Sequence, residues 1–134
     1  MVGEVLRESD RLMVDQYGNY FMQSLVQELG ESHRLKLIES IKHFIQVAQN
    51  ARGTHVLQNI VKAINSQSEE DAFINKVKTS GIHYLVKNQN SVHVLIQLIN
   101  KAQASNLDFM LDYVEANFVS VCKDKHGICL VKAM

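Results

Sequence analysis

The chain has 134 residues, the size of one ordinary domain, and a domain of this size buries roughly two thirds of its unfolded surface. Hydrophobic residues make up 46% of the sequence and charged residues 21%, which excludes a disordered or fibrous chain. The 14 basic and 14 acidic side chains cancel, so net charge alone does not indicate a polyanionic partner.

Four segments of the chain align with one another without gaps, which indicates an internal repeat. They read DQYGNYFMQSLV, NARGTHVLQNIV, NQNSVHVLIQLI and DKHGICLVKAM, and they begin at Asp15, Asn50, Asn88 and Asp124. Their starts lie 35, 38 and 36 residues apart. Proline is absent, so nothing prevents each segment from forming a helix.

Each segment has the features of a helix with one buried face. It opens with Asp or Asn, whose side chain accepts hydrogen bonds from the first free N–H groups of a helix. Three positions later comes a small residue: Gly18, Gly53, Ser91 or Gly127. Met22, Leu25 and Val26 then follow the i, i+3, i+4 spacing of a core stripe. The stripe recurs as Leu57, Ile60 and Val61 and as Leu95, Leu98 and Ile99.

Two further helices are predicted between consecutive segments. A long one is indicated by apolar pairs that recur every 36 residues: Leu37 and Ile38, Phe73 and Ile74, Phe109 and Met110. A short one is indicated by FIQVAQ, IHYLVK and FVSVCK, which begin at Phe44, Ile82 and Phe118. The acidic run SEED, from Ser68, is predicted to be a solvated helix start.

Three-helix units of this size cannot bury their apolar faces alone, so we expect them to stack into a curved solenoid with a concave and a convex surface. The predicted fold is all-α and covers residues 1–134, with approximate repeats 1–30, 31–66, 67–103 and an incomplete 104–134. A single irregular helical bundle with accidental periodicity is the alternative. Four in-frame copies argue against it.

A polar patch lies on the first aligned helix, roughly opposite its core stripe. Asn19, Tyr20 and Gln23 stand at i, i+1 and i+4 and therefore share a face. The second helix repeats the patch as Thr54, His55 and Gln58. Amide and hydroxyl groups can hydrogen-bond the edge of a nucleic-acid base, and aromatic rings can stack on its face. The patch is therefore a candidate site for bases.

These motifs resemble the repeats of the Pumilio (PUF) family. DQYGNYFMQ and ARGTHVLQ are similar to that family's recognition-helix signature, LVKNQNSVHVLIQLINK to its Asn-Gly-Asn-His unit, and CKDKHGICLVKAM to its Cys-containing unit. The resemblance covers nearly the whole chain and implies a right-handed curved solenoid of three-helix repeats. It also implies single-stranded RNA along the concave face, with one base per repeat. A complete domain of that family has about twice as many repeats, so the chain resembles part of one.

The resemblance assigns roles to the first two patches. Asn19 and Gln23 would contact the edge of a base while Tyr20 stacks between bases, a combination that the family associates with uracil. The second patch would recognise a base in the same way but more weakly, through Thr54, His55 and Gln58.

The third and fourth segments depart from this pattern. His93 keeps the stacking role, but Val92 and Ile96 occupy the edge-reading positions. A shift by one residue would restore Gln97 to the fifth position but would place Asn100 in the core stripe, so we reject it. The fourth segment has no standard reader at Ile128, Cys129 and Lys132, although Lys132 is expected to meet a phosphate. Base-specific contacts are therefore expected in the first two repeats.

The function implied by the resemblance is sequence-selective binding of messenger RNA. The chain would dock on a uridine-containing untranslated region and recruit protein cofactors that repress or destabilise the messenger. The alternative is a protein-binding helical-repeat scaffold whose RNA readout has degenerated through Val92, Ile96 and Ile128. Charge neutrality favours the scaffold, and the intact first patch favours RNA.

We expect a cytoplasmic protein that is not associated with membranes. The start MVGEVLRESD lacks the basic and apolar regions of a leader peptide, and no apolar run approaches the roughly 20 residues of a bilayer span. Cys122 and Cys129 fit neither a disulfide framework nor a zinc site. These observations favour a reducing compartment.

We also expect no catalytic activity, metal or cofactor. The sequence has no HxxxH or HExxH spacing, no Gly-rich phosphate loop and no serine elbow. His55 and His93 recur at one structural position, which indicates stacking rather than catalysis. Cys129 has no candidate base.

The sequence ends at Met134, inside the fourth predicted helix of the aligned set. The apolar side of that helix would then lack the neighbouring unit that covers its equivalents, whereas terminal repeats normally carry a polar outer face. We expect a longer repeat domain; the alternatives are association with another molecule through this C-terminal edge or fraying of the last turn.

Overall fold

The computed structural model describes residues 2–134, so Met1, where the first predicted repeat begins, lies outside the described residues. The described residues form helices and connecting turns, without a strand. In chain order these are α1 Val2–Arg7, α2 Ser9–Val14, α3 Gly18–Glu28, α4 Glu31–Ser40, α5 Phe44–Gln49, α6 Gly53–Ala63, α7 Gln67–Ser80, α8 Ile82–Val86, α9 Ser91–Lys101, η1 Ala104–Leu107, α10 Asp108–Ala116, α11 Phe118–Lys123 and α12 Gly127–Ala133. With 14 residues α7 is the longest, and the described helices all fall short of the length and hydrophobicity that a transmembrane segment requires.

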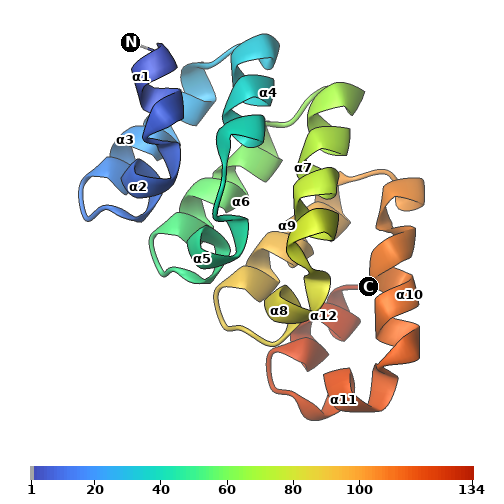
Figure 1. Cartoon of the computed structure of the whole chain (residues 1–134). Coiled ribbons are helices and arrows are strands. Elements are labelled where there is room, and N and C mark those ends of the chain that lie inside the picture. The colour runs from blue at the N-terminus through green and yellow to red at the C-terminus, as the bar shows by residue number, and fades with distance from the viewer. Residues whose placement is uncertain (1) are drawn as a thin grey trace.

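The helices are stacked in three layers along the molecule (Figure 1). The long helices α4, α7 and α10 form one layer and the short helices α2, α5, α8 and α11 form another. The third layer consists of α3, α6, α9 and α12, which we call the third helices. Each successive triplet of helices from α1 onward is numbered as repeat one to four. The predicted all-α solenoid of three-helix units is confirmed.

The turn before each third helix is closed by the residue that the sequence indicates. The Asp15 carboxylate accepts hydrogen bonds from the N–H groups of Tyr17 and Gly18 at 2.9 and 2.7 Å. These two bonds, with that from Gly18 the stronger influence, hold the pKa of Asp15 below its ordinary value. The same pair of bonds is made by Asn50, Asn88 and Asp124. Each Asp or Asn stands three residues before its helix, so it fixes the entry of the chain into that helix.

A close backbone approach explains the small residue that starts each third helix. A Cβ atom added at Gly53 would stand 2.4 Å from the carbonyl oxygen of Val47 on the preceding short helix. Similar approaches, at 2.7 and 2.4 Å, are found at Gly18 and Gly127. In the third repeat the equivalent residue is Ser91, whose hydroxyl donates a hydrogen bond to the carbonyl of Leu85 at 2.7 Å. The short helix and the third helix are thus packed against each other at one point in every repeat.

The predicted apolar stripes form one continuous core. Met22 and Val26 are buried, and so are their equivalents Leu57, Ile60, Val61, Leu95 and Leu98. Leu25 and Ile99, which were also predicted to be core residues, are half-buried at its margin. Between the other two layers, the Phe44 ring packs edge-on against Phe73 of the next repeat, with the ring centroids 5.5 Å apart.

The prediction of a solvated helix start over SEED holds for the exposed Ser68 and Asp71 at the start of α7 but is wrong for the two glutamates. Glu69 is fully buried and Glu70 is 7% exposed. Glu69 pairs with Arg34 of the preceding long helix and also accepts hydrogen bonds from the Ser66 hydroxyl and the Asn65 N–H. Burial alone would raise the pKa of Glu69, but the hydrogen bonds from Arg34, Asn65 and Ser66 outweigh it and hold the pKa below its ordinary value.

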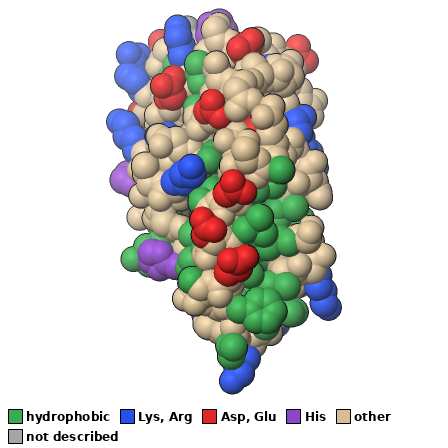
Figure 2. Space-filling model, turned by 90° about the vertical axis from the view of Figure 1, so that its right-hand side faces the viewer, with side chains coloured by type: hydrophobic (Ala, Val, Ile, Leu, Met, Phe, Trp, Pro, Cys, Tyr) green, Lys and Arg blue, Asp and Glu red, His purple; other side chains and the backbone are tan. Residues whose placement is uncertain are grey.

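Exposed apolar side chains gather at the fourth-repeat end of the molecule, where Figure 2 shows hydrophobic groups with acidic groups among them. The exposed residues of this end include Leu111, Phe118, Val119 and Met134. Phe44 stands at the same position of its repeat as Phe118 but is 3% exposed, because the next repeat covers it. Association through this end stays a prediction.

Candidate nucleic-acid interface

The third helices form one continuous layer in which α3 contacts α6, α6 contacts α9 and α9 contacts α12. The residues predicted to stack on bases, Tyr20, His55 and His93, occupy the same place on their helices, and Cys129 occupies that place on α12. All four are exposed, Tyr20 to 68%. The structure therefore places these side chains at equivalent surface positions of neighbouring helices, neither packed in the interior nor scattered over different surfaces.

The residue before each of these side chains is covered. Asn19, Thr54 and Val92 are 4%, 2% and 1% exposed, and Ile128 is half-buried. These residues were predicted to stand at the first edge-reading position. In this structure they lie beneath the surface row rather than in it, so the fifth-position residues Gln23, Gln58, Ile96 and Lys132 are the more accessible partners of the row.

Amide side chains of the first repeat form a hydrogen-bonded chain that extends into the second. Asn19 Nδ2 donates to the backbone carbonyls of Asp15 and Gln16 at 2.8 and 3.0 Å. Gln23 Nε2 donates to Asn19 Oδ1 at 3.2 Å, and Asn59 Nδ2 on α6 donates to Gln23 Oε1 at 2.9 Å. Gln23 is thus held from both sides.

Asn59 was not predicted as a site residue. Its position follows the fifth-position residue of the patch and carries a polar side chain in three of the third helices: Ser24, Asn59 and Gln97. The sequence offers only that recurrence as a sign of a role for Asn59. The hydrogen-bond partner of Asn59 is 36 residues away, so local spacing does not reveal the contact.

The second repeat makes a shorter version of this chain. Thr54 Oγ1 donates to the backbone carbonyl of Asn90 at 2.9 Å, and Gln58 Nε2 donates to Thr54 Oγ1 at 3.1 Å. Asn90 is itself tied back through its Nδ2, which donates to the carbonyl of Gln49 at 2.8 Å. Gln58 is therefore oriented from within its own helix, and the Thr54 hydroxyl bridges two repeats.

The third and fourth repeats lack such hydrogen-bonded pairs at these positions. Val92 is buried and Ile96 half-buried, which leaves His93 as the exposed member of the third patch. In the fourth patch Cys129 and Lys132 are exposed, and Cys129 Sγ lies 3.5 Å from the carbonyl oxygen of Lys125 of its own helical turn. Asn100 is exposed and Leu98 is buried, in agreement with the register chosen for the third segment.

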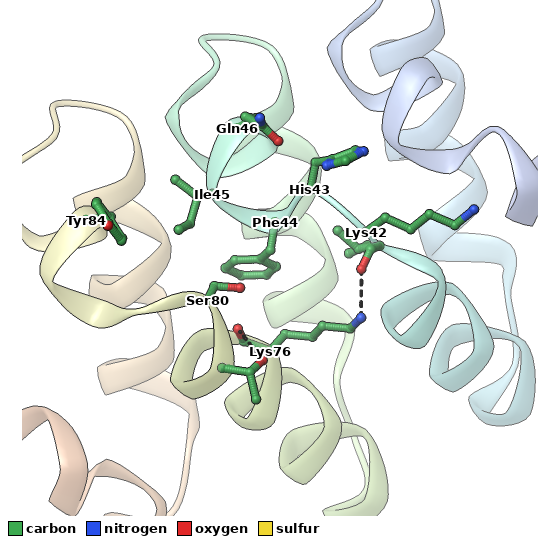
Figure 3. A pocket seen from close by; sticks show the side chains of 10 residues that line it. Lys42, His43, Phe44, Ile45, Gln46, Lys76, Ser80 and Tyr84 are labelled. Atoms are coloured by element: carbon green, nitrogen blue, oxygen red, sulfur yellow. Dashed lines mark hydrogen bonds between the residues drawn. The ribbon is translucent and has the colours of Figure 1, made fainter.

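A separate hollow of about 570 Å³ lies between the second and third repeats (Figure 3). Its lining comes from α5, α7, α8 and the turn before α5, and no residue of a third helix takes part. Lys76 points into it, but its Nζ donates to the carbonyls of Ile41 and Glu39 at 2.7 and 3.1 Å. The ammonium group thus binds free carbonyl groups at the C-terminal end of α4. Tyr84 is exposed at the edge of the hollow.

Metal ligands do not gather in the described part of the chain, where no group of three or more His, Cys, Asp and Glu residues is placed to hold an ion. Cys122 is half-buried and Cys129 exposed, and both are free thiols. The only aromatic pair among the histidines of the described residues joins His83 to Tyr84 on α8.

The fold and the row of side chains define an α-solenoid of three-helix repeats with a polar and aromatic layer on one side. A profile described as the Pumilio-family RNA binding repeat matches residues 11–42, 43–70 and 117–132, more than half of the chain. The chain belongs to the Pumilio repeat family. The stretch between 70 and 117, which contains the departures at Val92 and Ile96, lies outside the matched residues.

Curated relatives and solved structures agree with this assignment. A Pumilio domain-containing protein of Schizosaccharomyces pombe is 29% identical over 122 residues, which are 90% of this chain and 18% of the relative. Pumilio homolog 12 of Arabidopsis thaliana is 27% identical over 133 residues, 96% of this chain and 22% of the relative. The chain therefore spans about a fifth of the length of these relatives.

Among solved structures, the RNA-binding domain of yeast Puf5p bound to MFA2 RNA superposes with a TM-score of 0.90 at 26% identity, covering 99% of this chain and 38% of that one. The Puf4 RNA binding domain bound to the HO endonuclease RNA 3′ UTR recognition sequence gives a TM-score of 0.92 at 24% identity, covering 98% and 41%. The second likeness bears on the fold alone.

Proposed function

We propose that the chain binds single-stranded RNA along the surface formed by its third helices, with one base per repeat and a preference for uracil in the first two. The observation that carries this proposal is the row of exposed side chains, Tyr20, His55 and His93, at equivalent places on three adjacent helices. Planar groups repeated at the spacing of packed helices suit a strand whose bases are unstacked and held one by one.

In the first repeat, Tyr20 supplies the stacking surface and Gln23 the contact to the base edge. Stacking of a base on an aromatic side chain contributes about 1–3 kcal/mol. Uracil presents an N–H donor between two carbonyl acceptors, which suits an amide that has both a donor and an acceptor to offer. Asn19, predicted to share the edge contact, is buried below Gln23 and holds its amide in place.

The second repeat supplies a similar set with Thr54, His55 and Gln58, and the last two repeats contribute less. His93 stacks in the third repeat beside Val92 and Ile96, which have no polar group for a base edge. In the fourth repeat Ile128 and Cys129 give apolar contact, and the exposed Lys132 meets a phosphate. Base selectivity is therefore concentrated at one end of the chain.

The biological role that fits this reading is post-transcriptional control of messenger RNA in the cytoplasm. Support comes from the superposed RNA-binding domain of yeast Puf5p, which is bound to MFA2 RNA. We propose a uridine-containing untranslated region as the ligand of this chain and protein factors as further partners.

The test is a fluorescence-anisotropy titration of the chain with labelled oligouridine and oligocytidine at about 50 and 200 mM salt. Wild-type protein should bind oligouridine more tightly, and Tyr20→Ala combined with Gln23→Ala should abolish the difference. Tyr84→Ala, which removes an exposed tyrosine from α8, is the matched control and should bind like wild type. Equal binding of both oligomers that disappears at the higher salt would leave only phosphate contact, and no binding would favour a protein scaffold.

A further inference from the structure

We propose that Asn59, on the third helix of the second repeat, sets the base preference of the first repeat by fixing the orientation of the Gln23 amide. This inference rests on the RNA-binding function proposed above and adds a positioning residue to it. Asn59 lies outside the two sets of patch residues, is half-buried, and reaches across from α6 to α3 to donate to Gln23 Oε1 at 2.9 Å. A residue of the second repeat would thus orient the base-contacting side chain of the first.

The direction of every amide in this network follows from two backbone carbonyls. Carbonyl oxygens only accept hydrogen bonds, so the amide nitrogen of Asn19 must face Asp15 and Gln16. Asn19 Oδ1 is then left facing Gln23, and only the Gln23 amide nitrogen can bond to it. Gln23 Oε1 consequently faces Asn59, which must present its own nitrogen. A rotation of any one amide by a half turn would set like groups against each other.

Two hydrogen-bonding groups of Gln23 remain available for a base: the second Nε2 hydrogen and the second lone pair of Oε1. Their order is fixed, with the donor on the Asn19 side and the acceptor on the Asn59 side. Gln23 therefore offers a donor and an acceptor that cannot exchange places while both neighbours hold it.

Uracil tolerates this fixed order better than cytosine does. Its N3–H lies between two carbonyls, so N3–H can donate to Oε1 while either carbonyl accepts from Nε2, and the base can approach in either sense. Cytosine offers a single donor and acceptor pair that suits Gln23, its N4–H beside N3, so it pairs in one sense only. In the opposite sense donors face donors, which leaves hydrogen-bonding groups unsatisfied and disfavours binding. A Gln23 amide free to rotate would accommodate either sense and would lose this discrimination.

The second repeat lacks the corresponding bond and provides an internal comparison. Gln97 on α9 occupies the position of Asn59 one repeat further on, but no hydrogen bond joins it to Gln58 in the described chain. Gln58 is held only through its Nε2, by Thr54. Gln97→Ala is therefore a matched control for Asn59→Ala, since it truncates a half-buried amide at the same place of the next helix.

The experiment measures the ratio of the affinities for oligouridine and oligocytidine in the whole chain. Asn59→Ala should lower this ratio about fivefold, the equivalent of one net hydrogen bond. Asn59→Asp should lower it further, because the carboxylate attracts the Gln23 amide nitrogen away from Asn19. Gln97→Ala should leave the ratio unchanged, and Asn59→Ala should have no further effect on it in a Gln23→Ala background.

A second readout does not require RNA. The side-chain amide signals of Gln23 in the NMR spectrum of the free protein should shift in Asn59→Ala and not in Gln97→Ala. A merely structural role for Asn59 would change thermal stability without changing the affinity ratio, and that result would overturn the inference while the proposed function stands. A wild-type ratio near one would instead remove the proposed function, and this inference with it.

Discussion

The first two repeats and the last two share one backbone design and differ in what their third helices offer. All four have the Asx-closed turn and the small residue packed on the short helix. Only the first two carry amides at the fifth position, Gln23 and Gln58, each hydrogen-bonded to the first-position residue, Asn19 or Thr54. The fold and the readout therefore depend on different residues, so a repeat can lose its polar pair and keep its place in the solenoid.

The largest expected effect is on folding stability and concerns the ion pair between the second and third repeats, where the two halves of the chain meet. Arg34→Ala would leave Glu69 buried without its charged partner, and such a loss costs about 3–5 kcal/mol of folding stability. Urea unfolding monitored by circular dichroism measures it. Lys36→Ala, an exposed change on the same helix, is the control and should alter stability by less than about 0.5 kcal/mol. Equal stability of the two variants would mean that the pair does not couple the halves.

Acidic pH should also lower the folding stability through the same ion pair, by a smaller amount. The pKa of Glu69 is lowered in the folded protein, so folding favours its ionised form. The contribution to stability is complete above the ordinary value of 4.5 and is lost as the pH falls through the lower folded value. Thermal unfolding between neutral and acidic pH should show this loss, and Glu69→Gln should flatten that part of the profile. An unchanged profile in Glu69→Gln would assign the acid sensitivity to other carboxyl groups.

The difference between the halves should also appear in RNA affinity. Tyr20→Ala removes a stacking surface and should weaken oligouridine binding by about 1–3 kcal/mol, whereas Cys129→Ala, at the same place in the fourth repeat, should change it little. Titration of both variants against wild type measures the difference. Equal losses would show that the two ends of the row contribute alike, against the graded site proposed here.

The smallest expected effect is a gain. Ile96→Gln places an amide at the fifth position of the third helix of repeat three, beside the exposed His93, and should strengthen oligouridine binding by about 0.5–1.5 kcal/mol. The half-buried setting of Ile96 allows the change without a new buried polar group. Val92 and Ala133 cannot hold this amide as Asn19 and Asn59 hold Gln23, so oligocytidine binding should rise by a similar amount. A loss of affinity for both oligomers would indicate that Ile96 serves packing only.

The layout of the fold could be predicted because its determinants are local. Asp15, Gly18 and the stripe with Met22 lie within one helix and the turn before it, and the same order recurs in each repeat. Such patterns depend on helical period and on short-range hydrogen bonds, which a sequence displays directly. The exposure of Tyr20, His55 and His93 followed from the same period.

Burial of Glu69 and Thr54 could not be predicted, because each has a partner that lies a whole repeat away. Glu69 finds Arg34 at a separation of 35 residues, and Thr54 finds the carbonyl of Asn90 at 36. From the local sequence alone, a glutamate at a helix start or a threonine on a polar face is expected to be solvated. Here side-chain hydrogen bonds across the junctions between repeats take the place of water.

The most direct test of RNA binding by the third helices is to record amide and aromatic NMR signals of the chain while oligouridine is added. This binding mode predicts that the strongest changes fall on Tyr20, Gln23 and His55, weaker ones on His93, and that Tyr84 and the exposed apolar residues of α10 and α11 stay unchanged. Changes centred on Tyr84 or on α10 and α11, or no changes at saturating oligouridine, would contradict it.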